Sequence, residues 1–264
     1  MKLSKDQKDE IRRKLIDAAV DVITEKGFNN ATMREISSKA GIGSATIYNY
    51  FPTKEKILYG YFLDKQSELG REIEAIPEFD EYTLKEKFQA HIETLFTLYL
   101  RDREFVQIAY RLMFDSPLRT FTEFTPVREM FTGTASGFLD LAIERNEIID
   151  HPFRGFIANL YWDYTGLMLL YWLNDESENF SDTSSLIDMS LDVIVEVLKS
   201  GIIVKMTDIF SFLFRNHIYS NFTKMSELFS RGAGFRKYFS GESNAGEKQM
   251  KTGRKSGGKR GRTE

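Results

Sequence analysis

Hydroxyl and amide side chains are concentrated in one short stretch in the first quarter of the chain. Around Ile47 lie six small or polar residues: Ser44, Ala45, Thr46, Tyr48, Asn49 and Tyr50. If the stretch is helical, Ile47 and then Phe51 face a core while the six residues remain outside. Hydroxyls and amides bond phosphates or base edges, asparagine pairs with adenine through two hydrogen bonds, and methyl groups contact thymine. The stretch is therefore predicted to read the major groove of DNA.

Two helices before this stretch are predicted to support it. The first is charged except for one apolar stripe, formed by Ile11, Leu15, Ala18, Ala19, Val22 and Ile23. It ends at Gly27, because glycine readily adopts the left-handed backbone conformation that often terminates an α-helix. The second begins at Thr32, because Thr32 and Glu35 have the spacing of a capping box. Its buried side is expected to comprise Met33, Ile36 and Ala40.

A glycine turn joins the second helix to the reading stretch. Gly41 and Gly43 supply backbone freedom for a sharp turn, with Ile42 packed inward. Pro52 then closes the reading helix, and Thr53 can cap the next one. This order of elements is that of a helix-turn-helix. Because such geometry also occurs in proteins that bind no nucleic acid, a small helical bundle with packed tyrosines is the alternative at this point.

The same residues resemble the tetracycline-repressor-like (TetR) family of transcriptional regulators. The resemblance covers about the first quarter of the chain and rests on Ala18, Gly27-Phe28, Thr32-Met33-Arg34-Glu35-Ile36, Ala40-Gly41-Ile42 and the run Thr46-Ile47-Tyr48-Asn49-Tyr50-Phe51-Pro52-Thr53-Lys54-Glu55. The chain departs from the family pattern at Ser37, Gly43 and Ala45. Since Gly43 and Ala45 lie at the start of the reading helix, these departures bear on the operator sequence.

The resemblance implies which side chains meet a double-stranded DNA operator. The residues expected to anchor on phosphates are Thr32, Arg34, Thr46, Tyr48 and Lys54, and those expected to approach bases are Ser44, Ala45, Asn49 and Tyr50.

Charge is divided unevenly along the chain. Residues 1–65 carry a net charge of +3, residues 66–240 carry −10, and residues 241–264 carry +4. Because phosphates repel the acidic middle, we expect the N-terminal part to contact DNA, with the basic tail as a second candidate. The tail has too few apolar residues to fold. It could also touch an anionic membrane, and a merely solvated end is the simpler interpretation.

The expected fold is all-α and has two folded domains. Residues 1–55 form a three-helix helix-turn-helix DNA-binding domain, residues 56–240 a larger helical ligand-binding and dimerisation domain, and residues 241–264 the tail. Helices are predicted over 54–75, 83–101, 103–114, 127–146, 153–174, 185–200 and 203–230, with breaks at Pro77, Pro117, Pro126 and Pro152. Asp182 and Thr183 are expected to cap the helix over 185–200.

The segment 153–174 has more apolar surface than one core stripe requires. Its large apolar residues, which surround most of the helix, are Phe153, Phe156, Ile157, Leu160, Tyr161, Tyr164, Leu167, Met168, Leu170, Tyr171 and Trp172. By analogy with the TetR architecture, the helices 153–174 and 185–200 would pair with their copies as a four-helix bundle. We therefore expect a homodimer, with burial inside one large monomer core as the alternative.

An effector pocket is expected in the same domain. Candidate lining residues are Tyr110, Arg111, Met113, Phe114, Trp162, Asp163 and Trp172. Aromatic rings and a thioether suit an apolar or aromatic ligand, with Asp163 or Arg111 as a polar contact.

Catalytic and membrane functions are not indicated. The chain has no cysteine, its histidines (His91, His151 and His217) are far apart, and no catalytic or phosphate-binding motif is present, so we expect no enzyme activity, no metal and no cofactor. Each histidine is expected at the surface or a helix end. The N-terminus lacks the apolar stretch of a secretion signal. The apolar segment 155–173 contains Asn159 and Asp163, which favours a core helix over a membrane span. A cytoplasmic location without a membrane partner follows.

The sequence thus predicts a ligand-responsive transcriptional regulator. The favoured form is a repressor that binds a near-palindromic operator as a dimer and is released by a small effector. Two alternatives remain, a ligand-independent architectural DNA-binding protein and a helical protein-protein adaptor.

Overall fold

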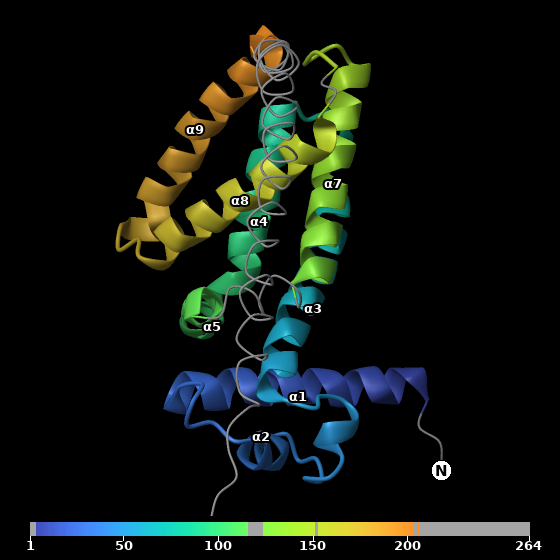
Figure 1. The fold of residues 1–264 in the computed structure, drawn as a ribbon, viewed down its shortest axis with the longest axis vertical. Coiled ribbons are helices and arrows are strands. Elements are labelled where there is room, and N and C mark those ends of the chain that lie inside the picture. Colours follow the sequence, from blue (N-terminus) through green and yellow to red (C-terminus); the bar gives the residue numbers. More distant parts are fainter. Residues whose placement is uncertain (1–3, 116–123, 151–152, 203–204, 206–264) are drawn as a thin grey trace, which may run out of the picture. The chain divides into compact units, whose positions relative to one another are not determined.

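The computed structural model describes residues 4–115, 124–150, 153–202 and 205. Within these ranges every regular element is a helix, which confirms the predicted fold class. The elements are α1 (Lys5–Lys26), α2 (Met33–Lys39), η1 (Ile47–Asn49), α3 (Lys54–Glu74), η2 (Phe79–Glu81), α4 (Leu84–Leu100), α5 (Arg103–Asp115), α7 (Thr125–Glu144), α8 (Arg154–Leu173), η3 (Glu178–Phe180) and α9 (Ser181–Ser200) (Figure 1).

The helices α1 and α2 form where local signals predict them. The stripe of α1 is buried from Leu15 to Ile23, and Gly27 ends the helix with φ of 76°. The capping box of α2 is complete, because Thr32 and Glu35 satisfy each other's backbone N–H groups. Ile36 is fully buried, and Gly41 follows with φ of 69°. These elements, with η1 and the start of α3, are called the head below.

The reading stretch is shorter and tighter than the predicted helix over 44–50. Only Ile47–Asn49 is helical, and its hydrogen bonds include Asn49 N to Thr46 O (3.0 Å) and Tyr50 N to Ile47 O (3.0 Å), the spacing of a 3-10 helix. Pro52 disfavours the α conformation at Phe51 and so ends the stretch there, while residues 44–46 form a turn and leave a run short enough to adopt 3-10 geometry readily.

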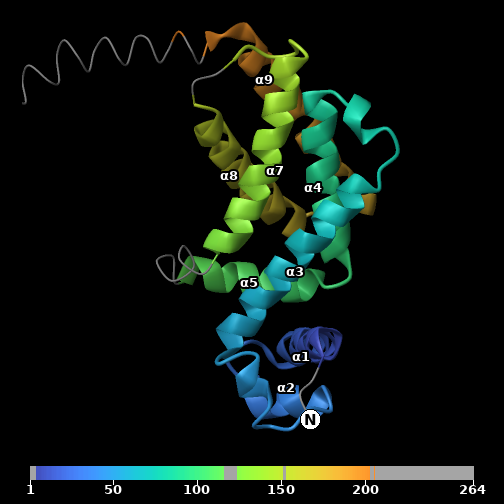
Figure 2. The same ribbon diagram turned by 90° about the vertical axis from the view of Figure 1, so that its right-hand side faces the viewer.

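Helix α3 leaves the head and packs against α4 of the larger domain. Figures 1 and 2 both show it rising from α1 and α2 toward the upper helices. A charged pair fastens α3 to α1: the Arg12 guanidinium donates to both carboxylate oxygens of Asp64 and also to Gly60 O at 3.3 Å. Gly60 is required here, because a Cβ at this position would lie 2.9 Å from the Phe51 ring. The head and α3 are therefore joined by directional contacts.

The core of the larger domain lies between α4, α7 and α8 and is rich in aromatic rings. Phe88 stacks on Tyr161 with ring centroids 4.1 Å apart, and Phe131 lies against both Tyr161 (5.3 Å) and Trp162 (5.2 Å). Helix α9 covers α4 and contacts α8. The Lys85 ammonium of α4 pairs with Asp188 and Asp192 of α9.

Two predicted boundaries need correction. Pro126 does not precede α7 but lies in its first turn, where the missing N–H costs nothing. Helix α9 begins at Ser181, so Asp182 and Thr183 lie in its first turn rather than before it. Its free N–H groups are satisfied from the preceding loop: Thr183 N donates to the Asp175 carboxylate at 2.9 Å, and Asp182 N donates to Ser177 Oγ at 3.1 Å.

His91 also departs from its prediction as a surface or helix-end residue, since it is only 1% exposed in the middle of α4. Among the described residues, no helix combines the length and apolarity needed to cross a bilayer. His151, His217, most of the predicted helix 203–230 and the tail 241–264 lie outside the described residues.

Candidate functional site

The polar face of the reading stretch is exposed. Ile47 is fully buried and Phe51 is 4% exposed, as predicted, whereas Tyr48 is 56% exposed. The other exposed residues of the stretch are Ser44, Ala45 and Asn49. Thr46 is half-buried. The head therefore presents hydroxyl, amide and methyl groups to the outside on a support of buried side chains.

Tyr50 is less exposed than Tyr48 and Asn49 on this polar face. Its side chain is half-buried, and with Arg12 and Pro52 it lines a groove of about 290 Å³ that reaches Pro126 and Val127 of α7. The ring is therefore placed at the junction of the head and the larger domain. Its predicted contact with bases stays a prediction.

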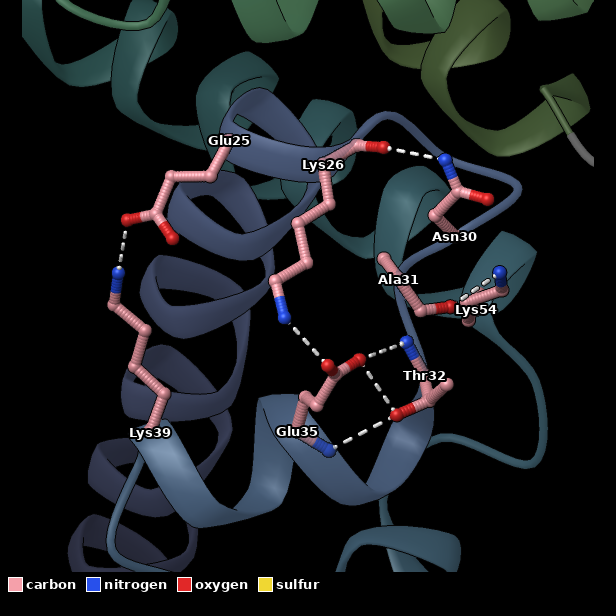
Figure 3. A network of polar contacts seen from close by, with 8 residues as sticks. All are labelled: Glu25, Lys26, Asn30, Ala31, Thr32, Glu35, Lys39 and Lys54. Carbon is pink, nitrogen blue, oxygen red and sulfur yellow. Dashed lines mark hydrogen bonds and ion pairs between the residues drawn. The ribbon is translucent and has the colours of Figure 1, made fainter.

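Thr32 and Glu35 form a closed polar network that links the start of α2 to the end of α1 (Figure 3). Thr32 Oγ1 donates to Glu35 Oε2 at 2.8 Å, and Lys26 Nζ donates to Glu35 Oε1 at 2.6 Å. The hydrogen bond from Lys26, followed by those from Thr32, lowers the pKa of Glu35 to about 2. Because the Thr32 hydroxyl proton is already bound to Glu35, this residue reaches a phosphate only by exchanging that partner.

The Lys54 side chain makes hydrogen bonds within the head that the sequence did not predict. Its ammonium donates to Phe28 O at 2.5 Å and Ala31 O at 2.6 Å, and it lies 4.6 Å from the centroid of the Phe28 ring. Figure 3 shows Lys54 beside Ala31. Two of the three N–H donors of an ammonium group are thus engaged. One donor is left for the predicted phosphate contact, and the side chain also fastens α3 to the loop before α2.

The remaining predicted anchor, Arg34, is exposed in the first turn of α2. On the same helix, Lys39 pairs with Glu25 (2.9 Å) and Asp21 (3.2 Å) of α1. The hydrogen bond from Lys39 to Glu25 makes the largest contribution to the raised pKa of Lys39. Lys39 therefore holds α2 on α1, whereas the exposed Arg34 stays a candidate for the predicted phosphate contact.

The two predicted effector tryptophans lie against different helices. Trp162 contacts Phe131 of α7, whereas Trp172 stacks on Phe96 of α4 at 5.2 Å. Tyr110 Oη donates to Gly166 O at 2.7 Å. Arg111 and Asp163 are exposed, and the side chains of Met113 and Phe114 lie outside the described residues. The assignment of these seven residues to a pocket stays a prediction.

The structure reveals a buried polar pair that the sequence did not indicate. His91 Nδ1 lies 3.3 Å from Tyr161 Oη, and Tyr161 Oη donates to Phe88 O at 2.8 Å. Since the hydroxyl proton goes to Phe88, we assign Nδ1–H of His91 as the donor to Tyr161. Nε2 of His91 is buried without a hydrogen-bond partner. Burial lowers the pKa of His91 to about 3, so the imidazole is neutral. In the sequence, only the aromatic residues of segment 153–174 indicated an aromatic core around Tyr161.

Among the described residues, no three histidine, aspartate or glutamate side chains are grouped so that they could hold a metal ion.

The fold and the exposed reading stretch together define a helix-turn-helix transcriptional regulator. Two family models match the chain: "Bacterial regulatory proteins, tetR family" over residues 15–61 and "Tetracyclin repressor-like, C-terminal domain" over residues 87–213. The chain belongs to the TetR family.

Individual relatives agree with this assignment. The chain is 31% identical over 136 residues to the "Fatty acid metabolism regulator protein" of Bacillus subtilis, which covers 51% of this chain and 69% of the relative. It is 40% identical over 58 residues to the "HTH-type transcriptional regulator BetI" of Klebsiella pneumoniae, but this covers only 22% of the chain and 30% of the relative. The crystal structure of the transcriptional regulator FadR from Bacillus subtilis in complex with stearoyl-CoA has the same fold, with a TM-score of 0.56, 24% identity, and coverage of 72% and 98% of the two chains.

The predicted function is thereby confirmed at the level of its class. The protein is a ligand-responsive DNA-binding repressor of the TetR family. The two alternatives, an architectural DNA-binding protein and a protein-protein adaptor, are not favoured by these matches.

Proposed function

We propose that the protein is a homodimeric repressor that binds a near-palindromic operator and is released from it by long-chain fatty acyl-CoA. The dimer would present two reading stretches about 34–36 Å apart to successive major grooves. The protein would act in the cytoplasm, where chromosomal DNA and acyl-CoA are both present.

The relationship to the fatty acid metabolism regulator supports the acyl-CoA effector most strongly. At 31% identity the match extends over 136 residues, more than the head alone contains. The fold neighbour FadR of Bacillus subtilis was crystallised with stearoyl-CoA. An acyl chain also fits the apolar or aromatic ligand expected from the sequence.

The interior of the larger domain has the composition that an acyl chain needs. Phe88, Phe131 and Phe138 are at most 8% exposed and lie on α4 and α7 around the neutral His91. Each buried CH₂ group of a ligand contributes about 0.8 kcal/mol. A long chain lodged between α4, α7 and α8 would therefore bind much more tightly than a short one, and binding would have to move these rings apart.

The outer faces of α8 and α9 support the homodimer. Large apolar side chains between 41% and 65% exposed lie on both helices or, for Phe153, directly before α8: Phe153, Phe156, Leu160, Leu167, Leu170, Tyr171, Met189 and Val193. The opposite side of α8 is already buried in the core through Ile157, Tyr161 and Leu169. Exposed large apolar side chains gathered on two helices indicate an interaction site, and a second copy offers the same two helices in return.

The exposed head supports the DNA-binding part of the proposal. Tyr48 and Asn49 protrude beside Ala45 and Ser44, and Arg34 is exposed on the neighbouring helix. We propose that Ser44, Ala45, Asn49 and Tyr50 approach bases, and that Thr32, Arg34, Thr46, Tyr48 and Lys54 contact phosphates.

Direct ligand binding tests the proposed effector. Isothermal titration calorimetry with stearoyl-CoA, octanoyl-CoA and CoA should give tight, weak and no measurable binding, in that order. Equal affinity for all three would show that the apolar interior does not hold the chain. Binding by none of them would exclude acyl-CoA as the effector.

A further inference from the structure

The Nε2 atom of His91 is a buried hydrogen-bonding group without a partner. The imidazole lies in the middle of α4 and is only 1% exposed. Leaving a buried polar atom without a hydrogen bond lowers stability, so such atoms are rare in folded proteins and call for an explanation. A bound molecule that completes the hydrogen bond would supply one.

The hydrogen bond on the other nitrogen of His91 determines what Nε2 can do. Tyr161 Oη gives its proton to Phe88 O at 2.8 Å, so Nδ1 of His91, 3.3 Å from the same oxygen, carries the imidazole proton. A neutral imidazole has only one proton on its two nitrogens. Nε2 therefore has a free lone pair, and its missing partner must be a hydrogen-bond donor.

The donors that lie one helical turn from this pair are already engaged. Lys87, four residues before His91 on α4, gives its three protons to backbone carbonyls of the loop that precedes α4, at 2.5, 2.9 and 2.7 Å. Thr165, four residues after Tyr161 on α8, donates its hydroxyl proton to Tyr161 O at 2.8 Å. Each would have to give up a hydrogen bond in order to reach Nε2, so the missing donor is expected from a bound molecule.

The rings on the α7 side of His91 restrict the chemistry of that molecule. The centroids of Phe131 and Phe138 lie 4.6 Å and 5.5 Å from that of the imidazole, and phenylalanine offers no hydrogen-bonding atoms. A water molecule in this place would lack the two to four polar partners that a buried water needs. An ammonium group would be buried without a counter-charge. The surroundings therefore favour an uncharged donor that is attached to an apolar chain.

Among uncharged donors, an alcohol fits this interior better than an amide. The N–H group of an amide is accompanied by a carbonyl oxygen, which needs a donor of its own when it is buried. A hydroxyl group is smaller and brings no carbonyl. It can sit on an acyl chain without adding charge, so the rest of the chain still contacts the aromatic rings.

We propose that His91 Nε2 accepts a hydrogen bond from a hydroxyl group on the bound acyl chain, so that the preferred effector is a long-chain hydroxyacyl-CoA. His91 is then the residue that determines this preference. The inference rests on the acyl-CoA-responsive function proposed above and adds a polar contact to an otherwise apolar site. An unmodified acyl chain binds at the same place but leaves Nε2 without a partner.

Calorimetric titrations of the wild-type protein test the preference. The ligands are stearoyl-CoA, hydroxystearoyl-CoA isomers with the hydroxyl at successive positions from the thioester to the methyl end, and the corresponding methoxystearoyl-CoA isomers, whose ether oxygen cannot donate. We expect one hydroxyl isomer to bind about tenfold more tightly than stearoyl-CoA, a difference of about 1.4 kcal/mol, and its methoxy counterpart to lose this advantage. If stearoyl-CoA binds but no hydroxyl isomer binds more tightly, the inference is wrong and the proposed function stands.

Two variants test whether the preference depends on His91. His91→Phe removes the acceptor and keeps an aromatic ring, and Tyr164→Phe is the matched control, because the Tyr164 hydroxyl on α8 is bonded to Ser190 Oγ of α9 at 2.7 Å. Circular dichroism establishes that each variant is folded. The ratio of the dissociation constants for stearoyl-CoA and the preferred isomer should fall to 1 or below in His91→Phe and stay about tenfold in Tyr164→Phe. A ratio that stays about tenfold in His91→Phe would overturn the role of Nε2.

Nitrogen NMR spectroscopy of protein with isotope-labelled histidine observes Nε2 directly in the wild type, even where His91→Phe does not fold. Burial lowers the pKa of His91 to about 3, so its signals are recognised as those of an imidazole that is still neutral at pH 5.5. The preferred hydroxyl isomer should move the Nε2 signal, and its methoxy counterpart should not. If no acyl-CoA binds, the proposed effector is wrong, and decanol with its methyl ether takes their place. A shift caused by decanol alone would still support the hydroxyl contact, and an unmoved Nε2 signal would refute it.

Discussion

His91 and Tyr161, which are 70 residues apart in the chain, share a hydrogen bond of 3.3 Å in the middle of the larger domain. Tyr161 uses its own proton on Phe88 O, so Nδ1–H of His91 is the donor in this bond, and burial keeps the imidazole neutral by lowering its pKa. The aromatic interior proposed to hold an acyl chain therefore also contains a buried ionisable side chain.

The first prediction concerns pH and His91. Its pKa in the folded protein, about 3, lies below the ordinary value of 6.5, so the unfolded chain binds more protons between these limits. Stability should hence be nearly constant above pH 6.5 and fall as the pH drops below it, by on the order of 1 kcal/mol at pH 5.5. Urea unfolding at pH 8 and pH 5.5 measures this. In His91→Phe the loss between the two values should disappear, and a loss equal to that of wild type would show that another group is responsible.

The second prediction separates the two roles of Lys54. Lys54→Met removes the donors to Phe28 O and Ala31 O, which should lower the free energy of unfolding by about 1–3 kcal/mol. If the third donor meets a phosphate, the slope of log K against log salt should also fall by about one unit. Denaturant unfolding and operator titrations at several salt concentrations give the two quantities independently. Unchanged stability would contradict the structural role, and an unchanged slope would contradict the phosphate contact.

The third prediction tests the reading stretch at Asn49. Asn49→Ala should weaken operator binding by about 1–3 kcal/mol through one base pair and leave binding to random DNA nearly unaltered. The measurement is a set of dissociation constants on an operator selected from random DNA and on its single-base variants. Ser38→Ala, an exposed change on α2 away from the proposed contacts, is the control. An equal loss on operator and random DNA would rule out a base contact by Asn49.

The fourth prediction concerns the dimer surface on α8 and α9. Leu167→Glu and Val193→Glu each place a charge on a residue that is more than 60% exposed in one chain. Folding of the chain should be unaffected, but burial of an unpaired carboxylate between two copies is strongly unfavourable, so both variants should be monomeric at micromolar concentration. Sedimentation velocity decides this. Leu100→Glu, 48% exposed and outside the two helices, should remain dimeric; a wild-type monomer would refute the dimer itself.

The head could be predicted from sequence because its signals are local. Thr32 and Glu35 of the capping box are three residues apart, and the turn after α2 depends on the positive φ of a single residue, Gly41. Local signals did not predict that residues 44–46 form a turn, which leaves the reading stretch with only the 3-10 turn Ile47–Asn49.

Side-chain roles that depend on distant partners could not be predicted. Lys54 was expected to face a phosphate, but its carbonyl partners lie 23 and 26 residues upstream. Arg103 meets Trp172 across 69 residues. Trp162 and Trp172 share one helix but contact α7 and α4 respectively, a difference that composition alone does not indicate.

Release of the operator by stearoyl-CoA tests the proposed function most directly. A labelled duplex of the selected operator is bound to the protein, and fluorescence anisotropy is followed as stearoyl-CoA or CoA is added. Stearoyl-CoA should dissociate the complex and weaken operator affinity roughly 5- to 150-fold, whereas CoA should have no effect. Anisotropy that stays constant at concentrations that saturate the protein with stearoyl-CoA would contradict an acyl-CoA-responsive repressor.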